Sequence, residues 1–291
     1  MSIIMKELLQ IGETCLEKAN CLDPRLDAEL LMCYLLKINK TQLFIKYANE
    51  VSEKTSDGYF ELIDIRASGK PVQYITGEQE FMGILFKVNE DVLIPRQDTE
   101  TLVEEVINVT KNGKAPGQIL DLCCGSGAIG ISLCKNMSDA KITAIDISGN
   151  ALEVAKENAV SAGVTKQIKF IKSDLFSALK KGFGGSKFNM ILSNPPYIPS
   201  GIIPTLQREI TEHEPLLALD GGEDGLDFYR RIIQEAPFYL KKKGLLIMEI
   251  GHDQALAIQG LLDDTGKYEE PVIIKDLAGM NRVIKCMLKV K

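Results

Sequence analysis

The chain has 291 residues, of which 45% are hydrophobic and 25% are charged, and its formal net charge is −6. These values are ordinary for a globular protein and leave room for two domains. The acidic balance argues against a protein that holds duplex nucleic acid mainly through phosphate contacts. No apolar run is long enough to cross a bilayer, and the first ten residues show no signal-peptide pattern. Seven cysteines without a C-x-x-C pair favour reduced thiols and a cytoplasmic location.

Residues 1–70 carry apolar side chains at helical spacing and no clear strand pattern. Asp23-Pro24 places a capping residue before a proline at the first helical position. Further helices are expected near residues 42–47 and 52–67. This region therefore predicts a small helical domain.

The pattern changes near Gly69. Residues 74–77, 80–83 and 85–88 read as short strands separated by glycines, so residues 71–96 are expected to form a β-hairpin connector. Asp98 is placed as the N-cap of the next helix. We therefore expect a third region, residues 97–291, to begin there.

Strand and helix patterns alternate from Gln118 onward. Strands are predicted at residues 118–122, 141–145, 168–172, 190–193, 244–249 and 283–288. Helical patterns lie between several of them. The alternation predicts an α/β domain with a Rossmann-like, open, mostly parallel sheet and helices on both faces.

A glycine-rich loop follows the first of these strands and opens a helix. It begins at Asp121 and reads Asp-Leu-Cys-Cys-Gly-Ser-Gly. Gly125 and Gly127 let the backbone turn sharply and approach a ligand closely. Asp146 ends the next strand, where an acidic residue can bind both hydroxyls of a ribose. With Gly130 the loop also satisfies the dinucleotide fingerprint, so by itself it predicts only an adenosine-type cofactor.

Asp174 ends the third strand of the series. Its carboxylate can lie near an adenine, or it can cap the segment that follows. Both roles are compatible with its position.

The turn Asn194-Pro195-Pro196-Tyr197 ends an apolar run that reads as a buried strand. Prolines cannot continue a strand ladder, and they hold the preceding residues in extended geometry, so the turn is stiff. It fixes an Asn amide, two proline carbonyls and a Tyr ring in one arrangement. Such a set can accept hydrogen bonds from a planar NH2 group and stack on its face. The turn therefore favours methylation of a conjugated amino or amide nitrogen over the alternative of a plain surface turn.

Taken together, these motifs resemble those of the class I S-adenosylmethionine-dependent methyltransferases, and more narrowly the HemK family of release factor glutamine methyltransferases. Further segments carry the narrower resemblance nearly end to end: Asp23–Leu31, Pro71–Gly77, Ile94–Glu100, Glu214-Pro215, Ala218–Leu226, Glu249–Gln254 and Lys275–Gly279.

The resemblance implies a seven-stranded sheet and S-adenosyl-L-methionine as cofactor, with S-adenosyl-L-homocysteine as product. The substrate would be the glutamine side-chain amide (N5) in the Gly-Gly-Gln motif of peptide-chain release factors, gripped by the helical domain and connector. We expect no membrane, nucleic-acid or metal binding. The catalytic residues would be Asn194, Pro195, Pro196 and Tyr197. The cofactor residues would be Asp121, Cys123, Cys124, Gly125, Ser126, Gly127, Asp146, Ile147, Asp174, Leu175 and Asn194.

Three departures from the family pattern concern the cofactor site, one of them being Cys124 in place of a Thr in the loop. Cys123 stands where the first loop glycine is expected, and Leu175 stands where Trp is frequent. Three rival functions stay open at this point. An adenine-N6 DNA or RNA methyltransferase shares the Asn-Pro-Pro-Tyr motif, an NAD-dependent oxidoreductase shares the glycine spacing, and a non-catalytic module could retain only the fold.

Overall fold

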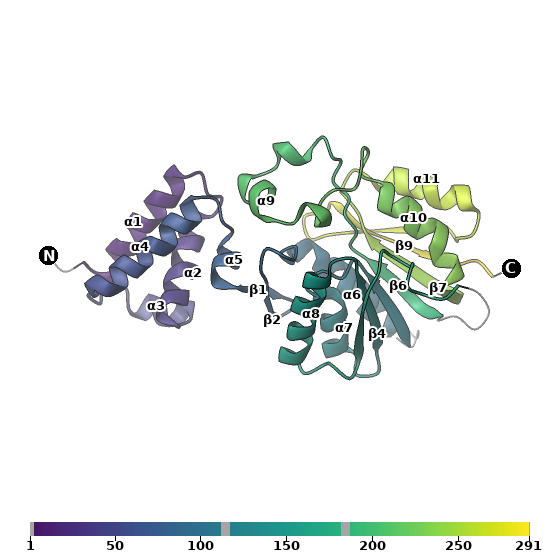
Figure 1. Cartoon of the computed structure of the whole chain (residues 1–291), viewed down its shortest axis with the longest axis horizontal. Coiled ribbons are helices and arrows are strands. Elements are labelled where there is room, and N and C mark those ends of the chain that lie inside the picture. Colours follow the sequence, from purple (N-terminus) through teal and green to yellow (C-terminus); the bar gives the residue numbers. More distant parts are fainter. Residues whose placement is uncertain (1–2, 112–116, 182–186, 291) are drawn as a thin grey trace. The chain divides into compact units, whose positions relative to one another are not determined.

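The computed structural model describes residues 3–111, 117–181 and 187–290. The chain forms two compact units (Figure 1). The first contains the described residues up to Glu78 together with Leu206–Glu214. The second contains Gln79–Thr205 and the chain from Pro215 onward. No helix within the described ranges is long and apolar enough to cross a membrane.

The first unit is helical. Its elements are α1 (Met5–Lys18), α2 (Pro24–Leu36), α3 (Lys40–Ile45), α4 (Glu53–Ala67), α5 (Val72–Thr76) and α9 (Arg208–His213). Asn39 and Ser52 cap α3 and α4 by accepting hydrogen bonds from the backbone amides of Gln42 and Thr55. The interpretation of residues 74–77 as a strand was wrong. Pro71 accepts the first helical hydrogen bonds of α5 there, and Gly77 ends the helix with φ of 77°.

The core of this unit is apolar and closely packed. Leu8, Leu16, Leu31 and Met32 are fully buried around the ring of Tyr59. Gly12 makes room for that ring, because a Cβ at this position would lie 2.2 Å from the Tyr59 hydroxyl oxygen. A side chain at position 12 would therefore push α1 and α4 apart.

A buried ion pair crosses the same unit. Arg66 Nε on α4 lies 2.6 Å from Asp27 Oδ2 on α2, and both side chains are almost fully buried. Its Nη2 lies 2.6 Å from Glu209 Oε2 on α9, a helix that is distant in the sequence. One guanidinium thus compensates two carboxylates, and it connects the inserted segment Leu206–Glu214 to the N-terminal helices.

We predict that Arg66→Ala lowers the free energy of unfolding by about 3 kcal/mol, because it leaves the Asp27 carboxylate buried without its partner. Denaturant unfolding of the full chain measures this loss. Arg25→Ala is the matched control, since it breaks an exposed pair with Glu29 and should leave the midpoint unchanged. Equal stability of the two variants would contradict the structural role of Arg66.

The second unit contains a two-stranded sheet, β1 (Glu78–Phe81) and β2 (Ile84–Lys87), and a seven-stranded sheet. The order of the large sheet is β5-β4-β3-β6-β7-β9-β8. Its strands are β3 (Gln118–Leu122), β4 (Lys141–Asp146), β5 (Ile168–Lys172), β6 (Phe188–Ser193), β7 (Leu240–Glu249), β8 (Val272–Lys275) and β9 (Asn281–Met287).

Neighbouring strands from β5 to β7 run parallel, and β9 pairs antiparallel with both β7 and β8. The predicted fold class is confirmed. Short β8 was not predicted, because its burial is only partial and only three of its four residues are apolar.

Alternate residues of the central strands serve two separate cores. Ile119, Met190 and Ile247 pack with α6 (Glu100–Lys111), α7 (Ala128–Asn136) and α8 (Gly149–Ser161). Their neighbours Leu120, Ile191 and Leu246 pack with α10 (Asp227–Glu235) and α11 (Ala255–Thr265). Figure 1 shows these two sets of helices on opposite faces of the sheet. Because the strands from β5 to β7 run parallel, their carboxyl ends lie at the same edge of the sheet, which is where ligands of open α/β sheets bind.

Candidate functional site

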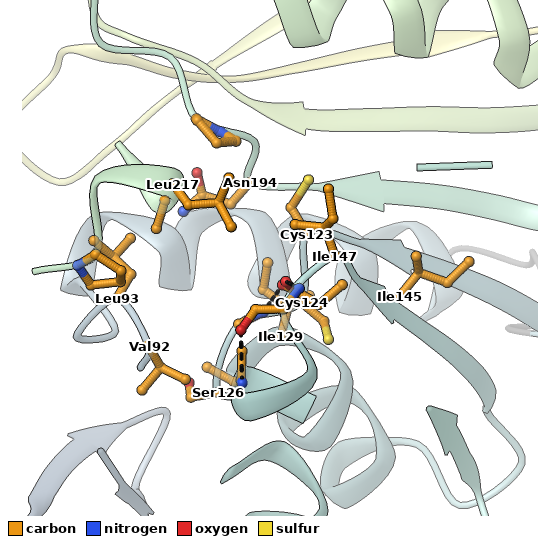
Figure 2. Close-up of a pocket in the computed structure, with 18 of the residues that line it drawn as sticks. Val92, Leu93, Cys123, Cys124, Ser126, Ile129, Ile145, Ile147, Asn194 and Leu217 are labelled. Atoms are coloured by element: carbon orange, nitrogen blue, oxygen red, sulfur yellow. Dashed lines mark hydrogen bonds between the residues drawn. The ribbon is translucent and has the colours of Figure 1, made fainter. Parts of the chain in front are cut away.

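A pocket lies at this edge of the sheet (Figure 2). Segments that follow four parallel strands contribute to its wall: Cys123–Ser126 after β3, Asp146–Ser148 after β4, Ser173–Leu175 after β5, and Asn194 with Pro196 after β6. Most of the predicted cofactor residues and part of the Asn-Pro-Pro-Tyr turn thus share one cavity.

The glycine-rich loop has a left-handed backbone at three positions. The φ angles of Cys123, Gly125 and Gly127 are 58°, 52° and 80°. A Cβ at Gly125 would meet no other heavy atom within 4 Å, so the backbone there faces open space in the pocket. A Cβ at Gly127 would lie 2.9 Å from Ile131 Cδ1, because Gly127 is the N-cap of α7 and lies close to the side chain of Ile131 in that helix. Gly125 therefore allows approach of a ligand, whereas Gly127 allows the helix to start.

Asp146 supports this loop and also lines the pocket. Its Oδ2 accepts a hydrogen bond from the Gly125 amide at 2.9 Å, and its Oδ1 accepts one from Ser148 at 2.9 Å. Burial raises the pKa of the carboxyl group, and the backbone hydrogen bonds oppose that shift. A carboxylate has about four acceptor positions, so Asp146 can also accept hydrogen bonds from a hydroxyl group of a ligand.

Asp121 lies behind the pocket. It is fully buried, does not line the cavity, and its Oδ2 accepts a hydrogen bond from the Gly130 amide at 3.1 Å. Burial raises its pKa to about 7. Asp121 thus holds the first turn of α7, and Gly127 likewise lies outside the pocket wall.

The remaining cofactor candidates, Ile147, Asp174 and Leu175, all line the pocket. Both carboxylate oxygens of Asp174 accept hydrogen bonds from Arg231 at 2.8 Å. The cap of the following turn comes instead from Ser173, whose hydroxyl accepts from the Ala178 amide. Ile147 is 45% exposed and Leu175 is buried, so they offer apolar surface to a flat ring.

The Asn-Pro-Pro-Tyr turn is held from behind. Asn194 Nδ2 donates to Thr99 Oγ1 at 3.2 Å, and the Tyr197 hydroxyl donates to Glu249 Oε1 at 3.3 Å. Gln254 Nε2 donates to the Tyr197 carbonyl at 2.9 Å. Asn194 and Pro196 line the pocket, whereas Pro195 and Tyr197 lie outside its wall.

Sequence reasoning assigned no role to several other lining residues: Arg96, Thr99, Pro215, Leu217, Ala218, Phe228 and Arg231. Most of them belong to, or lie next to, segments that carried the family resemblance. Single polar or apolar residues in loops have no periodicity, so only their place in the fold reveals them.

Comparisons with known proteins agree with this geometry. Residues 7–77 match the family model described as PrmC N-terminal domain, and residues 97–213 match the model described as Methyltransferase small domain. A release factor glutamine methyltransferase of Clostridium botulinum is 39% identical over 284 residues, which cover 97% of this chain and 99% of that protein. One from Moorella thermoacetica is 40% identical over 259 residues, 89% of each chain. This chain belongs to the release factor glutamine methyltransferase family.

The solved structure of a methyltransferase from Pyrococcus furiosus shares the fold, with a TM-score of 0.50 and 17% identity over 72% of this chain and 90% of that one. Family membership removes the oxidoreductase and non-catalytic alternatives and makes S-adenosylmethionine the cofactor. The pocket suits this molecule. Open space at Gly125, the Asp146 carboxylate and the apolar side chains of Ile147 and Leu175 match an amino-acid moiety, a ribose and an adenine in chemical character.

We predict that Cys123→Gly leaves the fold intact and keeps or tightens cofactor binding. A left-handed residue with a Cβ costs roughly 1–2 kcal/mol, which glycine avoids, although glycine also makes the unfolded chain more flexible. Calorimetric titration with S-adenosylmethionine measures the affinity. Cys124→Gly is the control, because it removes a buried side chain without relieving a left-handed backbone, and it should destabilise the protein. A large loss of affinity in folded Cys123→Gly would contradict this view of the loop.

We predict that Asp146→Ala weakens S-adenosylmethionine binding by on the order of 1–3 kcal/mol. The substitution removes a charged acceptor from the pocket and also releases the Gly125 amide. Calorimetry on the folded variant measures the change. Asp139→Ala, an exposed aspartate away from the pocket, controls for the loss of one negative charge. Unchanged affinity in Asp146→Ala would remove this carboxylate from the site.

Proposed function

We propose that this protein methylates the side-chain amide nitrogen (N5) of the glutamine in the Gly-Gly-Gln motif of peptide-chain release factors. One observation carries the proposal. Asn194 lines the same pocket as the cofactor loop, and its NH2 group is directed to Thr99. Its amide oxygen is therefore left to accept a hydrogen bond from a substrate.

The chemistry requires alignment more than activation. An amide nitrogen is a poor nucleophile because its lone pair is delocalised into the carbonyl group. The sulfonium of S-adenosylmethionine supplies an already activated methyl group. The task of the protein is to hold the nucleophile in line and to stabilise the charge that develops on it.

Asn194 Oδ1, at the pocket wall, is suited to accept one N–H group of the glutamine amide, and we propose that the carbonyl of the adjoining Pro195 accepts the other when the substrate enters, although Pro195 itself lies outside the wall. Acceptors fixed in this way favour positive charge on the nitrogen without reorganisation during the reaction. The stiff diproline turn keeps the two oxygens at a constant separation. Tyr197, anchored through its hydroxyl to Glu249, supports the turn and shields it from water.

Neither His213 nor His252 lines the pocket, so the two histidines of the chain are not placed to act as a base. The proton becomes acidic only after the methyl group has been transferred. Its release to solvent then needs no dedicated acceptor in the site.

The helical unit is proposed to bind the release factor. It carries several exposed apolar side chains, among them Phe44 and Ile45, which are 71% and 74% exposed. Large exposed apolar residues on neighbouring positions are typical of contact surfaces for other proteins.

The decisive test is incubation with labelled S-adenosylmethionine and a release factor, followed by mass spectrometry of the Gly-Gly-Gln peptide. We expect one added methyl group on the glutamine. A release factor with this glutamine replaced by alanine is the matched control and should stay unlabelled. Labelling of adenine in an oligonucleotide instead would overturn the proposal in favour of the nucleic-acid alternative.

We predict that Asn194→Ala reduces the rate of methylation by about 10²-fold or more, as when one preorganised hydrogen-bonding group is removed from an active site. Binding of S-adenosylmethionine should persist, because other residues hold it. Asn194→Asp keeps an acceptor but lacks the NH2 group that donates to Thr99, so it should be impaired to a similar degree. Single-turnover assays measure the rates. Near-normal methylation by Asn194→Ala would refute the proposed role of the turn.

A further inference from the structure

Two segments with no assigned role meet behind the Asn-Pro-Pro-Tyr turn. Thr99 ends the short 3₁₀ turn Gln97–Thr99, and Glu249 ends β7. Both are buried, with exposures of 5% and 1%. Thr99 accepts a hydrogen bond from Asn194, and the Thr99 hydroxyl is one of the neighbours that lower the pKa of the Glu249 carboxyl group. Since Tyr197 also donates to Glu249, two residues of the turn converge on one carboxyl group.

The hydrogen-bonding capacity of a hydroxyl group makes this arrangement directional. Thr99 has a single O–H proton, whereas an ionised carboxylate can only accept. When the Thr99 proton is directed to Glu249, the Thr99 oxygen can only accept from its other neighbour. The group of Asn194 that faces Thr99 must then be the NH2, and Asn194 Oδ1 must point the other way.

We propose that Thr99 and Glu249 are positioning residues that fix the orientation of the Asn194 amide, with its oxygen presented to the substrate nitrogen. This inference rests on the function proposed above. Neither residue needs to touch the reacting atoms, because each acts through Asn194 or Tyr197. The two segments were visible in the sequence only as parts of a family resemblance.

The backbone of Glu249 is held in place, and its Oε2 is buried without a hydrogen-bond partner among the described residues. The Tyr229 hydroxyl donates to the Glu249 backbone carbonyl at 2.8 Å. Arg282 on β9 is the cation that acts on the carboxylate, and it is itself paired with Asp98 at 2.9 Å and Asp276 at 3.1 Å. A rigid acceptor of this kind can impose one orientation on the hydroxyl groups that donate to it.

The state of the Glu249 proton should affect the orientation. Burial raises the pKa of Glu249 to about 7, against the opposing effects of Thr99, Arg282 and Tyr197, while Asp98 adds to the increase. Below this pH the carboxylic acid can donate to Thr99. Thr99 is then free to donate to Asn194, and the amide can turn over. The proton on Glu249 therefore favours the unproductive orientation.

The first test compares Thr99→Val with Thr99→Ser. Valine has the shape of threonine without its hydroxyl, so kcat for release factor methylation should fall by about 10- to 100-fold while the Kd of S-adenosylmethionine stays within about threefold. Serine keeps the hydroxyl and should restore kcat to within about threefold of wild type. Wild-type kcat in Thr99→Val, or equal impairment of both variants, would overturn the proposal.

The second test is the pH profile of kcat in Glu249→Gln, a variant of the same shape that folds without a buried charge. Wild type should lose activity below a pH of about 7. The Gln variant can both donate and accept, so its kcat should be reduced at pH 8 and should lack this acidic limb. An unchanged acidic limb in Glu249→Gln would exclude Glu249 as its origin and overturn the proposal.

A double-mutant cycle distinguishes a positioning role from a general structural one. It also provides a test if one of the single variants above folds poorly. If Thr99 acts through Asn194, Thr99→Val in the Asn194→Ala background should have no further effect on kcat. If the fall in kcat of the double variant equals the product of the falls in the two single variants, the two residues act independently and the proposal is overturned. Wild-type enzyme runs in every series. Absence of glutamine methylation by wild type contradicts the proposed function itself, whereas methylation that is indifferent to Thr99 contradicts only the positioning role.

Discussion

The end of strand β6 is the constraint on which the site depends. Pro195 and Pro196 cannot extend the ladder to either neighbouring strand, so the chain must leave the sheet directly after Ser193. Both prolines are buried. Gln254, the residue before α11, donates a hydrogen bond to the Tyr197 carbonyl. Asn194 is thereby fixed at the pocket wall, beside the loop that follows β3. In the proposed function, the methyl donor and the acceptor amide would meet here because these two strands are adjacent in the sheet.

The sequence predicted the sheet because parallel buried strands leave long apolar runs between helical patterns. It also predicted the pocket positions of Asp146 and Asn194, since both directly follow strands. The sequence could not show that Asp121 binds the first turn of α7 and does not face the ligand. Either role is compatible with its position in the motif. Thr99 and Glu249 were visible as family segments, but their meeting requires β7 to lie beside β6.

The place of the inserted segment Leu206–Glu214 in the fold could not be predicted from the sequence either. Nothing in the spacing of Leu206–Glu214 indicates that it packs with the N-terminal helices, since Glu209 lies 143 positions after Arg66 in the sequence. A buried guanidinium needs acidic partners, and sequence periodicity does not say from where they come. The same segment follows the Asn-Pro-Pro-Tyr turn after residues 198–205, and it is followed directly by Pro215 and then by Leu217, which line the pocket. The covalent chain thus leads from the Asn-Pro-Pro-Tyr turn through a segment of the helical unit and back to the pocket wall.

Two buried acids show that the fold is not optimised for stability alone. Burial raises the pKa of Asp121 and of Glu249 to about 7, well above the ordinary values of these groups. The folded protein therefore binds more protons than the unfolded chain between about pH 4 and 7, and both groups reduce stability as the pH rises through this window. An apolar residue at either position would remove this cost. Retaining Glu249 is reasonable if an ionised acceptor is needed to orient Thr99 and Asn194, because the ionisation that destabilises the fold is the one that favours the productive amide.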